Sequence, residues 1–394
     1  MILKVKFFNV FFVFLSRWSI GSKKRGIIYF FRIINPKLYL HFVKEKKHLF
    51  KNNFDLIRLI ACIQVLLLHH IAFFKLKDIS TLDLIESGIW NFPGVNIFFI
   101  ISGYLIFQSL ERNDAVFFLK KRFLRLFPAL IVCFILTVLL LFGFRALTIK
   151  EFLSFEFVKW TAAQLTFFQF YNPDIVRDFG FSPPNGALWT ISVEIQFYLF
   201  IATLWYFFLK NRTLRTKNLI LITLFVLSAA YNYFFNTYLL AEGLAYKLSF
   251  VFFLSYLYFF MAGAFFYINR DILITKLKGK ALFWILCFII ATCLLNYFEL
   301  RYYRYVFNGL SLAMLILLCG LVFSIAFTKV NLSQKLLKGN DVSYGIYIYQ
   351  MPVLNLFFHL QKNTEPIQFL LSFAICIMMG ILSWYLVEKN FLKR

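Results

Sequence analysis

Residues 54–70 read FDLIRLIACIQVLLLHH, an apolar run with an arginine, Arg58, near its start and His69 near its end. On an α-helix, the eleven-residue separation of these two side chains turns through about 1100°, three turns plus roughly 20°, so both share one face. They lie about 16 Å apart along the helix axis. Ionisable side chains inside an apolar span are costly and usually functional. The run therefore predicts a helix whose polar face is reached from both sides of a membrane.

The whole chain has the composition of an integral membrane protein. Of its 394 residues, 61% are hydrophobic and 15% are charged, and several apolar runs exceed the ~20 residues needed to span hydrocarbon. The net charge of +24 lies between the apolar runs. It therefore indicates membrane topology and attraction to anionic lipid, not nucleic-acid binding. The histidines and cysteines are scattered, so we expect neither a metal site nor a disulfide framework.

Ten apolar runs are candidate membrane spans, and the basic residues set their direction. With the N-terminus inside, the inner segments hold 31 Lys and Arg residues and the outer loops hold 10, which places both termini in the cytoplasm. We predict an all-α membrane protein of about ten transmembrane helices. A basic membrane-surface segment (1–53) precedes one membrane domain (54–394). The expected spans are roughly 54–74, 89–110, 129–147, 187–208, 219–235, 248–268, 281–298, 306–328, 341–360 and 367–387.

One outward loop, residues 145–186, is much longer than the others. The turn Pro183-Pro184-Asn185-Gly186 stops any helix and leads the chain into the fourth span. Two interpretations are equally open. The loop covers an outward-facing cleft, or it lies as a flap at the lipid interface.

The expected topology brings two ionisable groups to similar depth. The first span runs outward, which places His69 in the outer half, and the fourth span runs inward from Trp189, which places Glu194 there too. A carboxylate beside an imidazole orients it and stabilises the imidazolium formed on proton abstraction. The pattern thus predicts a general base, His69, oriented by Glu194. The alternative is a buried ion pair that only joins two helices.

A basic run lies on the cytoplasmic side of the third span. In FFLKKRFLRLFP (117–128), Arg122 and Arg125 share a helical face, and Lys121 lies four residues before Arg125. Such clusters suit phosphates, which arginine binds bidentately. By itself, this run favours the alternative of a cytoplasmic flank that binds lipid headgroups.

Two further spans carry polar residues that suit either helix packing or the lining of a cavity. The second span reads GVNIFFIISGYLIF (94–107) and includes Ser102 and Gly103. The ninth begins DVSYGIYIYQMP (341–352), with a polar stripe of Ser343, Tyr344, Tyr347 and Gln350.

Taken together, these segments resemble the membrane acyltransferase family 3. The matching segments follow the Arg58 and His69 pair in the family's order: GVNIFFIISGYLI, FLKKRFLRLFPAL, ALWTISVEIQFYLF, VSYGIYIYQMP and WYLVEKNFL. That family typically O-acylates bacterial surface polysaccharides, including O-antigen, capsule and exopolysaccharide. The resemblance implies that Arg58 and His69 are essential to acyl transfer. It also matches motif positions of the family to Ser102, Gly103, Arg122, Arg125 and Glu194.

Three positions depart from the family's pattern. Asn96 stands where many members have Asp, Gln350 where many have His, and Asn390 where Pro is frequent. The first two changes remove ionisable groups, which leaves His69 as the chief candidate base.

The resulting hypothesis is a multi-pass O-acyltransferase of the bacterial inner membrane. It moves an acyl group, expected to be acetyl, from cytoplasmic acyl-CoA to a hydroxyl of a surface polysaccharide or its lipid-linked precursor. His69 is the expected base or, alternatively, the nucleophile of an acyl-His intermediate. Acyl-CoA is a substrate, no permanently bound cofactor is expected, and membrane lipids and the glycan are the partners. The rival hypotheses are a transporter or flippase of a lipid-linked glycan or other solute, and a structural or sensor protein.

The hypothesis assigns two further groups of residues. The donor phosphates are expected to meet four basic side chains: Arg58, Lys121, Arg122 and Arg125. An oxyanion donor and the cavity lining are expected among Ser102, Tyr104, Trp189, Ser192, Tyr347 and Gln350.

Overall fold

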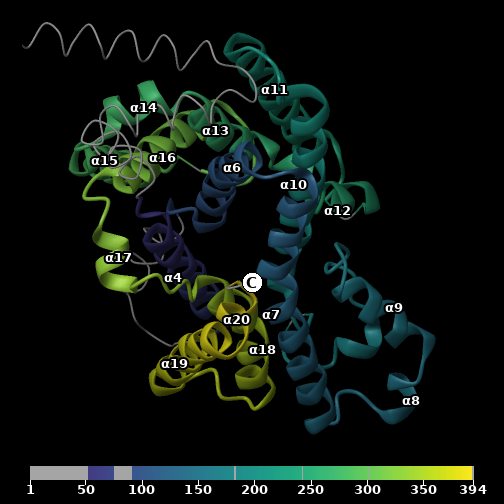
Figure 1. The fold of residues 1–394 in the computed structure, drawn as a ribbon. Helices are drawn as coiled ribbons and strands as arrows, with labels where there is room; N and C mark the ends of the chain where they lie inside the picture. Colours follow the sequence, from purple (N-terminus) through teal and green to yellow (C-terminus); the bar gives the residue numbers. More distant parts are fainter. Residues whose placement is uncertain (1–51, 75–90, 182, 242, 301, 393–394) are drawn as a thin grey trace, which may run out of the picture. The chain divides into compact units, whose positions relative to one another are not determined.

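The computed structural model describes residues 52–74, 91–181, 183–241, 243–300 and 302–392 (Figure 1). The expected basic segment 1–53 lies outside these ranges apart from its last two residues. Every regular element within them is helical. The main helices are α4 (Phe54–Phe73), α6 (Gly94–Arg112), α7 (Ala115–Gly143), α8 (Ile149–Phe152), α9 (Phe155–Gln164), α10 (Trp189–Leu204), α11 (Leu214–Tyr238), α12 (Leu244–Phe250), α13 (Leu257–Ile268), α14 (Arg270–Leu277), α15 (Ala281–Tyr297), α16 (Gly309–Phe327), α17 (Leu332–Leu337), α18 (Ser343–His359), α19 (Pro366–Ser383) and α20 (Lys389–Leu392).

Five shorter helical turns complete the described elements. Three are 3-10 turns and two are π-helical. They are η1 (Asp174–Val176), η2 (Gly186–Leu188), η3 (Trp205–Leu209), η4 (Phe253–Ser255) and η5 (Trp384–Glu388). The two π-turns prolong α10 and α19, so each of these helices continues beyond its α-helical part.

The chain is a multi-pass membrane protein. Among the described residues, seven helices are long and apolar enough to cross a bilayer, and the pair α13 and α14, bent by 93°, makes an eighth if it is one broken span. The helices α15 and α18 also fall in expected spans, but each has only 17 residues. A helix therefore lies in every expected span, while the total of about ten crossings remains a prediction.

The helix α7 joins the basic run and the third span without a break. Asp114 caps its N-terminus by accepting a hydrogen bond from the Phe117 amide at 2.8 Å. The helix then continues through Pro128 for 29 residues, because proline removes one backbone donor but does not always end a helix. The expected third span (129–147) and the basic run before it are therefore parts of one continuous helix.

Glycine sets the closest helix contact in the core. A Cβ on Gly103 of α6 would collide with the carbonyl of Phe260 on α13, and a Cβ on Gly263 of α13 would collide with the carbonyl of Ile100 on α6. Only residues without a side chain let two backbones approach this closely. Gly103 thus serves packing, one of the two roles that its sequence context allowed.

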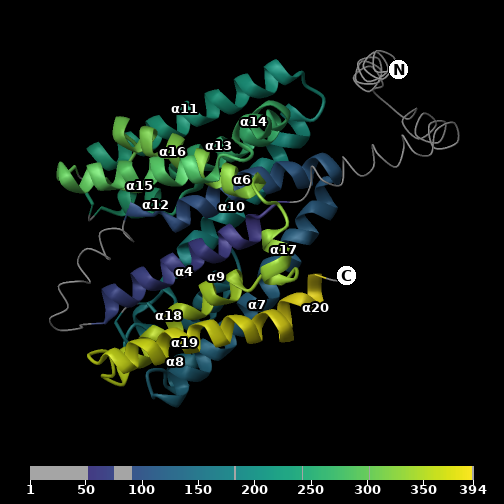
Figure 2. The same ribbon diagram turned by 90° about the vertical axis from the view of Figure 1, so that its left-hand side faces the viewer.

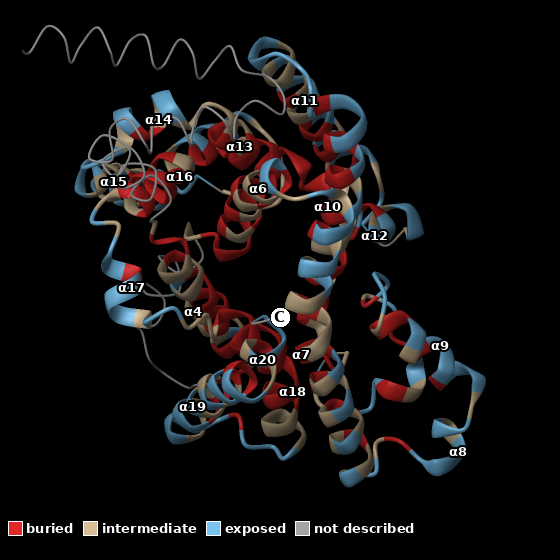
Figure 3. Ribbon diagram, viewed as in Figure 1, coloured by how far each residue is buried: buried red, intermediate tan, exposed pale blue. Residues whose placement is uncertain are grey.

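Burial separates an inner set of helices from an outer set (Figure 3). In α6, 67% of the membrane-length window is buried, whereas the figure for α11 is 28%. The helix α15 is also largely exposed, although nearly all of its side chains are apolar. Apolar surface of this kind suits lipid contact, so α11 and α15 belong to the outer layer.

Two parallel helices form the frame of the site. The helices α4 and α18 lie side by side (Figure 2). Arg58 contacts Asp341 just before α18 begins, and eleven residues further along α4, His69 contacts Gln350 of α18. Since both contacts advance along the two chains together, the helices run in the same direction. The polar face of α4 that the sequence indicated is therefore turned toward α18, both at Arg58 and at His69.

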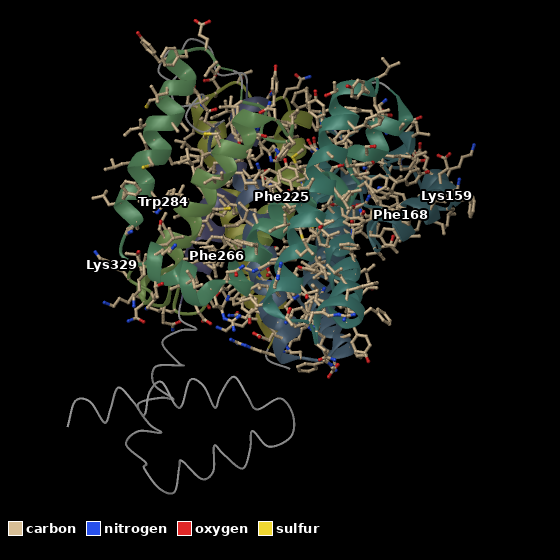
Figure 4. The ribbon with its side chains drawn as sticks, turned by 90° about the horizontal axis from the view of Figure 1, so that it is seen from above. Lys159, Phe168, Phe225, Phe266, Trp284 and Lys329 are labelled. Atoms are coloured by element: carbon tan, nitrogen blue, oxygen red, sulfur yellow. The ribbon has the colours of Figure 1, made fainter. Side chains whose placement is uncertain are left out.

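The long loop has a surface part and an inserted part. The helices α8 and α9 pack against the C-terminal half of α7 through Phe157 and Trp160, while Phe155 and Val158 stay exposed. Lys159 and Phe168 lie at the edge of the molecule (Figure 4). This part fits the interpretation of a flap at the lipid interface.

Beyond α9 the loop turns into the helix bundle. Gln169 is buried and accepts a hydrogen bond from the Ser192 hydroxyl at 2.5 Å. Asn185 is buried too, and its amide donates to the carbonyl of Ile348 on α18 at 2.8 Å. These contacts start α10 inside the bundle instead of at its outer surface. The inserted part therefore fits neither a lipid flap nor a simple cover.

Candidate active site

A buried cluster of ion pairs occupies the end of the α4–α18 pair at which both helices begin. Asp341 Oδ2 accepts hydrogen bonds from Arg58 at 2.7 Å and from Arg125 at 2.6 Å. Arg125 also pairs with Glu388 at 3.3 Å. The Ser343 hydroxyl donates to the other oxygen of Asp341 at 2.5 Å. Two of the arginines expected to meet donor phosphates are therefore already neutralised by carboxylates.

Neither Asp341 nor Glu388 was singled out from the sequence. Both stand at the edge of an apolar run in a chain that holds only 18 acidic residues. A carboxylate at that position in so basic a protein has many cationic partners available, and this was the signal that could have found them.

Arg122 and Lys121 differ from their neighbours in the ion-pair cluster. The Arg122 guanidinium lies 5.4 Å and 5.6 Å from the ring centroids of Phe118 and Tyr198. Its buried Nε has no hydrogen-bond partner among the described residues. Lys121 is exposed and donates to Asn113 at 3.3 Å. Within the described ranges, neither side chain pairs with a carboxylate, so both keep charge for an anion.

A hollow adjoins this cluster at Arg58 and Ser343. Its empty volume is about 450 Å³, part of it open to solvent. Polar groups on four helices face it along with apolar ones, as a site that guides a ligand requires. The lining residues are Arg58, Val95, Phe98, Phe99, Ser102, Thr190, Ile191, Glu194, Ser343, Tyr344 and Tyr347.

Glu194 lies in this hollow and is not paired with His69. Its carboxylate accepts hydrogen bonds from the Tyr198 hydroxyl and, at 3.4 Å, from the Ser102 hydroxyl. In the described structure, His69 is paired with Gln350 instead. The predicted contact between the imidazole and the carboxylate is therefore wrong.

The sequence analysis expected Glu194 and His69 at similar depth, and the position where α10 starts explains why they are not. Because the inserted loop delivers the chain into the bundle, Thr190 already lies beside Tyr347, with their hydroxyl oxygens 2.6 Å apart. Glu194 lies about one turn further along α10. It therefore shares the hollow with Arg58, whereas Gln350 lies about one turn beyond Tyr347 on α18, further from the start of that helix.

The hydrogen bonds of Gln350 determine which imidazole nitrogen of His69 carries the proton. Gln350 Nε2 donates to the carbonyl of Tyr347 at 2.9 Å, so its Oε1 faces His69 Nδ1 at 3.0 Å. An amide oxygen can only accept, and Nδ1 must therefore carry the hydrogen. Nε2 of His69 then holds the lone pair. This is the tautomer that a general base requires.

Two of the expected lining residues serve packing. Tyr104 is buried, with its ring 5.0 Å from Phe54 and 5.1 Å from Tyr267. Ser192 is also buried and holds the inserted loop through Gln169. Neither residue lines the hollow.

The fold and the site together define a class of protein. It is a multi-pass helical membrane protein with a buried ion-pair cluster, a polar hollow beside that cluster and a histidine hydrogen-bonded to a glutamine. Comparison with known families gives this class a name, since the model of the acyltransferase domain matches residues 51–388, more than four fifths of the chain. The chain belongs to this family, which confirms the resemblance to membrane acyltransferase family 3.

Individual relatives agree with this assignment. Nodulation protein 10 of Rhizobium leguminosarum bv. viciae is 30% identical over 365 residues, which cover 87% of this chain and 94% of that protein. The O-acetyl transferase of Shigella phage Sf6 is 29% identical and covers 87% of this chain and 96% of its own length. The peptidoglycan O-acetyltransferase OatA of Listeria monocytogenes is 28% identical over 77% of this chain and 51% of its own length. No solved structure gives a significant match.

Proposed function

We propose that this acyltransferase moves an acetyl group from cytoplasmic acetyl-CoA to a hydroxyl of a bacterial surface polysaccharide or its lipid-linked precursor. Family membership supports acyl transfer. The printed names of two relatives, an O-acetyl transferase and a peptidoglycan O-acetyltransferase, support acetyl as the group and a glycan as the acceptor.

The observation that carries the proposal is the contact between His69 and Gln350. Because Gln350 Oε1 accepts from Nδ1 at 3.0 Å, Nε2 is left as the proton acceptor. We assign to Gln350 the orienting role that the sequence gave to Glu194. The amide does this without a charge, and it suits a position where many relatives have histidine.

The reaction follows from this base. His69 Nε2 takes the proton of the acceptor hydroxyl while the oxygen attacks the thioester carbonyl carbon, so a C–O bond forms and the carbonyl oxygen becomes an oxyanion. The oxyanion collapses and breaks the C–S bond. The departing CoA thiolate takes the proton from His69, which restores the neutral imidazole. The ester product and free CoA account for every atom.

The donor approaches from the basic surface. Lys121 and Arg122 are proposed to bind its phosphates, because both retain positive charge that no described carboxylate neutralises. Arg58 and Arg125 join them only if the donor displaces Asp341, which now occupies both guanidiniums. The thioester arm then lies in the hollow and reaches toward His69, about 16 Å from Arg58.

This path fixes the topology that we propose. Ten crossings with both termini in the cytoplasm place the arginine cluster on the inner side and His69 in the outer half of the bacterial inner membrane. The parallel α4 and α18 agree with this arrangement, since the first and ninth spans must cross in the same direction.

The experiment compares base-labile O-acetyl groups on surface polysaccharide by NMR in cells that carry wild type or His69→Ala. The wild-type and variant proteins must be present in the membrane in equal amounts. His359→Gln is the control, because that ring packs between Phe144 and Phe179 away from Gln350. The proposal predicts that acetyl groups disappear in His69→Ala and persist in the control. Unchanged acetyl in His69→Ala contradicts it.

A further inference from the structure

One carboxylate oxygen in the hollow accepts no hydrogen bond within the described ranges. Glu194 receives both of its hydrogen bonds, from the Ser102 and Tyr198 hydroxyls, on Oε1, which leaves Oε2 without a donor. A carboxylate oxygen held among apolar groups is costly in this condition. The other polar side chains of the hollow all have partners: Arg58 and Ser343 on Asp341, Ser102 on Glu194, Thr190 beside Tyr347, and Tyr344 on the carbonyl of Leu126.

The walls of the hollow around this oxygen are apolar. Ile191 precedes Glu194 by one turn on α10, and Phe98 and Phe99 precede Ser102 by one turn on α6. Because Ser102 contacts Glu194, these three apolar side chains line the hollow next to the carboxylate. The hollow therefore suits a ligand that has apolar segments and at least one N–H or O–H donor.

A single tyrosine links Glu194 to the basic surface. The Tyr198 hydroxyl donates to Glu194, and the ring centroid of the same side chain lies 5.6 Å from the Arg122 guanidinium. Tyr198 is buried, so it holds a fixed position between the two charged groups. Arg122 is one of the side chains proposed above to bind the donor phosphates. A donor whose phosphates lie on Arg122 therefore has its adjoining portion beside Glu194.

We propose that Glu194 is a positioning residue for the donor, and that its Oε2 accepts a hydrogen bond from an amide N–H of the pantetheine arm of acyl-CoA. This inference rests on the proposed acyl transfer from acyl-CoA. The arm follows the diphosphate and carries two secondary amides, separated by methylene groups, before it ends at the thioester. Its methylene groups fit the apolar walls, and the charge-assisted hydrogen bond sets how far the thioester advances along the hollow. Glu194 neither gains nor loses a proton in this role.

The test compares two probes that share their phosphates and differ in the arm. One is coenzyme A, and the other is 3′-phospho-ADP, the nucleotide part of coenzyme A without the pantetheine. Binding of each probe to purified protein in lipid nanodiscs is measured by titration calorimetry. Glu194→Gln keeps the shape of the side chain and an oxygen for Tyr198 and Ser102, but it turns an NH₂ group toward the arm. Glu156→Gln is the matched control, because Glu156 is exposed on α9.

We expect Glu194→Gln to weaken the binding of coenzyme A by about 10- to 100-fold, as for the loss of one charge-assisted hydrogen bond, and to change the binding of 3′-phospho-ADP by less than about threefold. Tyr198→Phe should show the same selectivity with a smaller loss, since it removes the hydroxyl that holds the carboxylate but keeps the ring beside Arg122. Arg122→Ala should weaken both probes. Thermal unfolding of each variant reports on the fold.

The outcomes separate this inference from the function on which it rests. Equal weakening of both probes in Glu194→Gln would indicate a structural role, and wild-type affinity for coenzyme A would remove the contact; either result overturns the assignment. In transfer assays, a raised KM for the glycan at unchanged KM for acetyl-CoA would place the acceptor at Glu194 and overturns it too. If wild type binds neither probe and transfers no acetyl group, the proposed function itself fails.

Discussion

Replacing Asp341 by asparagine tests the ion-pair cluster that joins three parts of the chain. The carboxylate accepts from Arg58 at 2.7 Å, from Arg125 at 2.6 Å and from the Ser343 hydroxyl at 2.5 Å, with 12% of its side chain exposed. Asparagine has the same shape but no charge, and its amide group turns two donors toward the guanidiniums. Asp341→Asn therefore leaves two arginines without their carboxylate.

The magnitude follows from these contacts. Each hydrogen bond to a charged partner contributes about 1.5–3 kcal/mol, and removing one partner of a buried ion pair costs about 3–5 kcal/mol. We therefore expect Asp341→Asn to lower the free energy of unfolding by about 3–5 kcal/mol, the range for a broken buried pair. Part of that cost is the desolvated charge that remains on Arg58 and Arg125.

The assay is thermal unfolding followed by tryptophan fluorescence in detergent, with Asp174→Asn as the control. Asp174 pairs with Arg177 on the long loop, where both side chains are exposed and ion pairs contribute little. The account predicts a clearly lower midpoint for Asp341→Asn and an unchanged midpoint for the control. If both variants have the unfolding midpoint of wild type, the cluster does not hold these helices together and the reasoning is refuted.

Three further perturbations test the packing, the donor site and the base. Gly103→Ala should prevent stable folding, because the added Cβ meets a carbonyl of α13. Gly143→Ala should unfold at the wild-type midpoint, since nothing lies within 4 Å of the added Cβ. Melting curves in detergent distinguish the two variants. Arg122→Ala should raise KM for acetyl-CoA about tenfold or more at similar kcat, as expected for loss of one charge-assisted contact of about 1.5–3 kcal/mol. An unchanged KM in steady-state assays would show that Arg122 is not part of the donor site. Gln350→Leu should lower kcat about 100-fold by releasing the tautomer of His69, while Gln350→His retains activity; equal rates for both variants contradict the orienting role.

The sequence predicted the positions of the spans and the shared face of Arg58 and His69 because both follow from local periodicity. Apolar length locates a span, and 3.6 residues per turn fix which side chains align. The structure places these two residues at opposite ends of the α4–α18 pair, as expected. Such features need no knowledge of how distant segments pack.

The depth of Glu194 could not be predicted in this way. It depends on the inserted part of the long loop, which Gln169 and Asn185 tie to α10 and α18 by single hydrogen bonds. A count of residues from the outer surface misses that insertion and misplaces every side chain on α10. Polar residues in a semi-apolar loop were the available signal, because buried amides need partners inside the bundle.

The most direct test of acyl transfer by a histidine base uses purified protein in nanodiscs with ¹³C-acetyl-CoA and the cell's own lipid-linked glycan. Wild type and His69→Gln are compared at equal amounts of folded protein. The account predicts that wild type releases CoA and places ¹³C-acetyl on a glycan hydroxyl, and that His69→Gln loses this rate by about 10²–10⁴-fold while still binding acetyl-CoA. Transfer at the wild-type rate in His69→Gln contradicts the account. Binding of neither substrate by wild type, together with movement of the glycan across the membrane, points instead to a transporter.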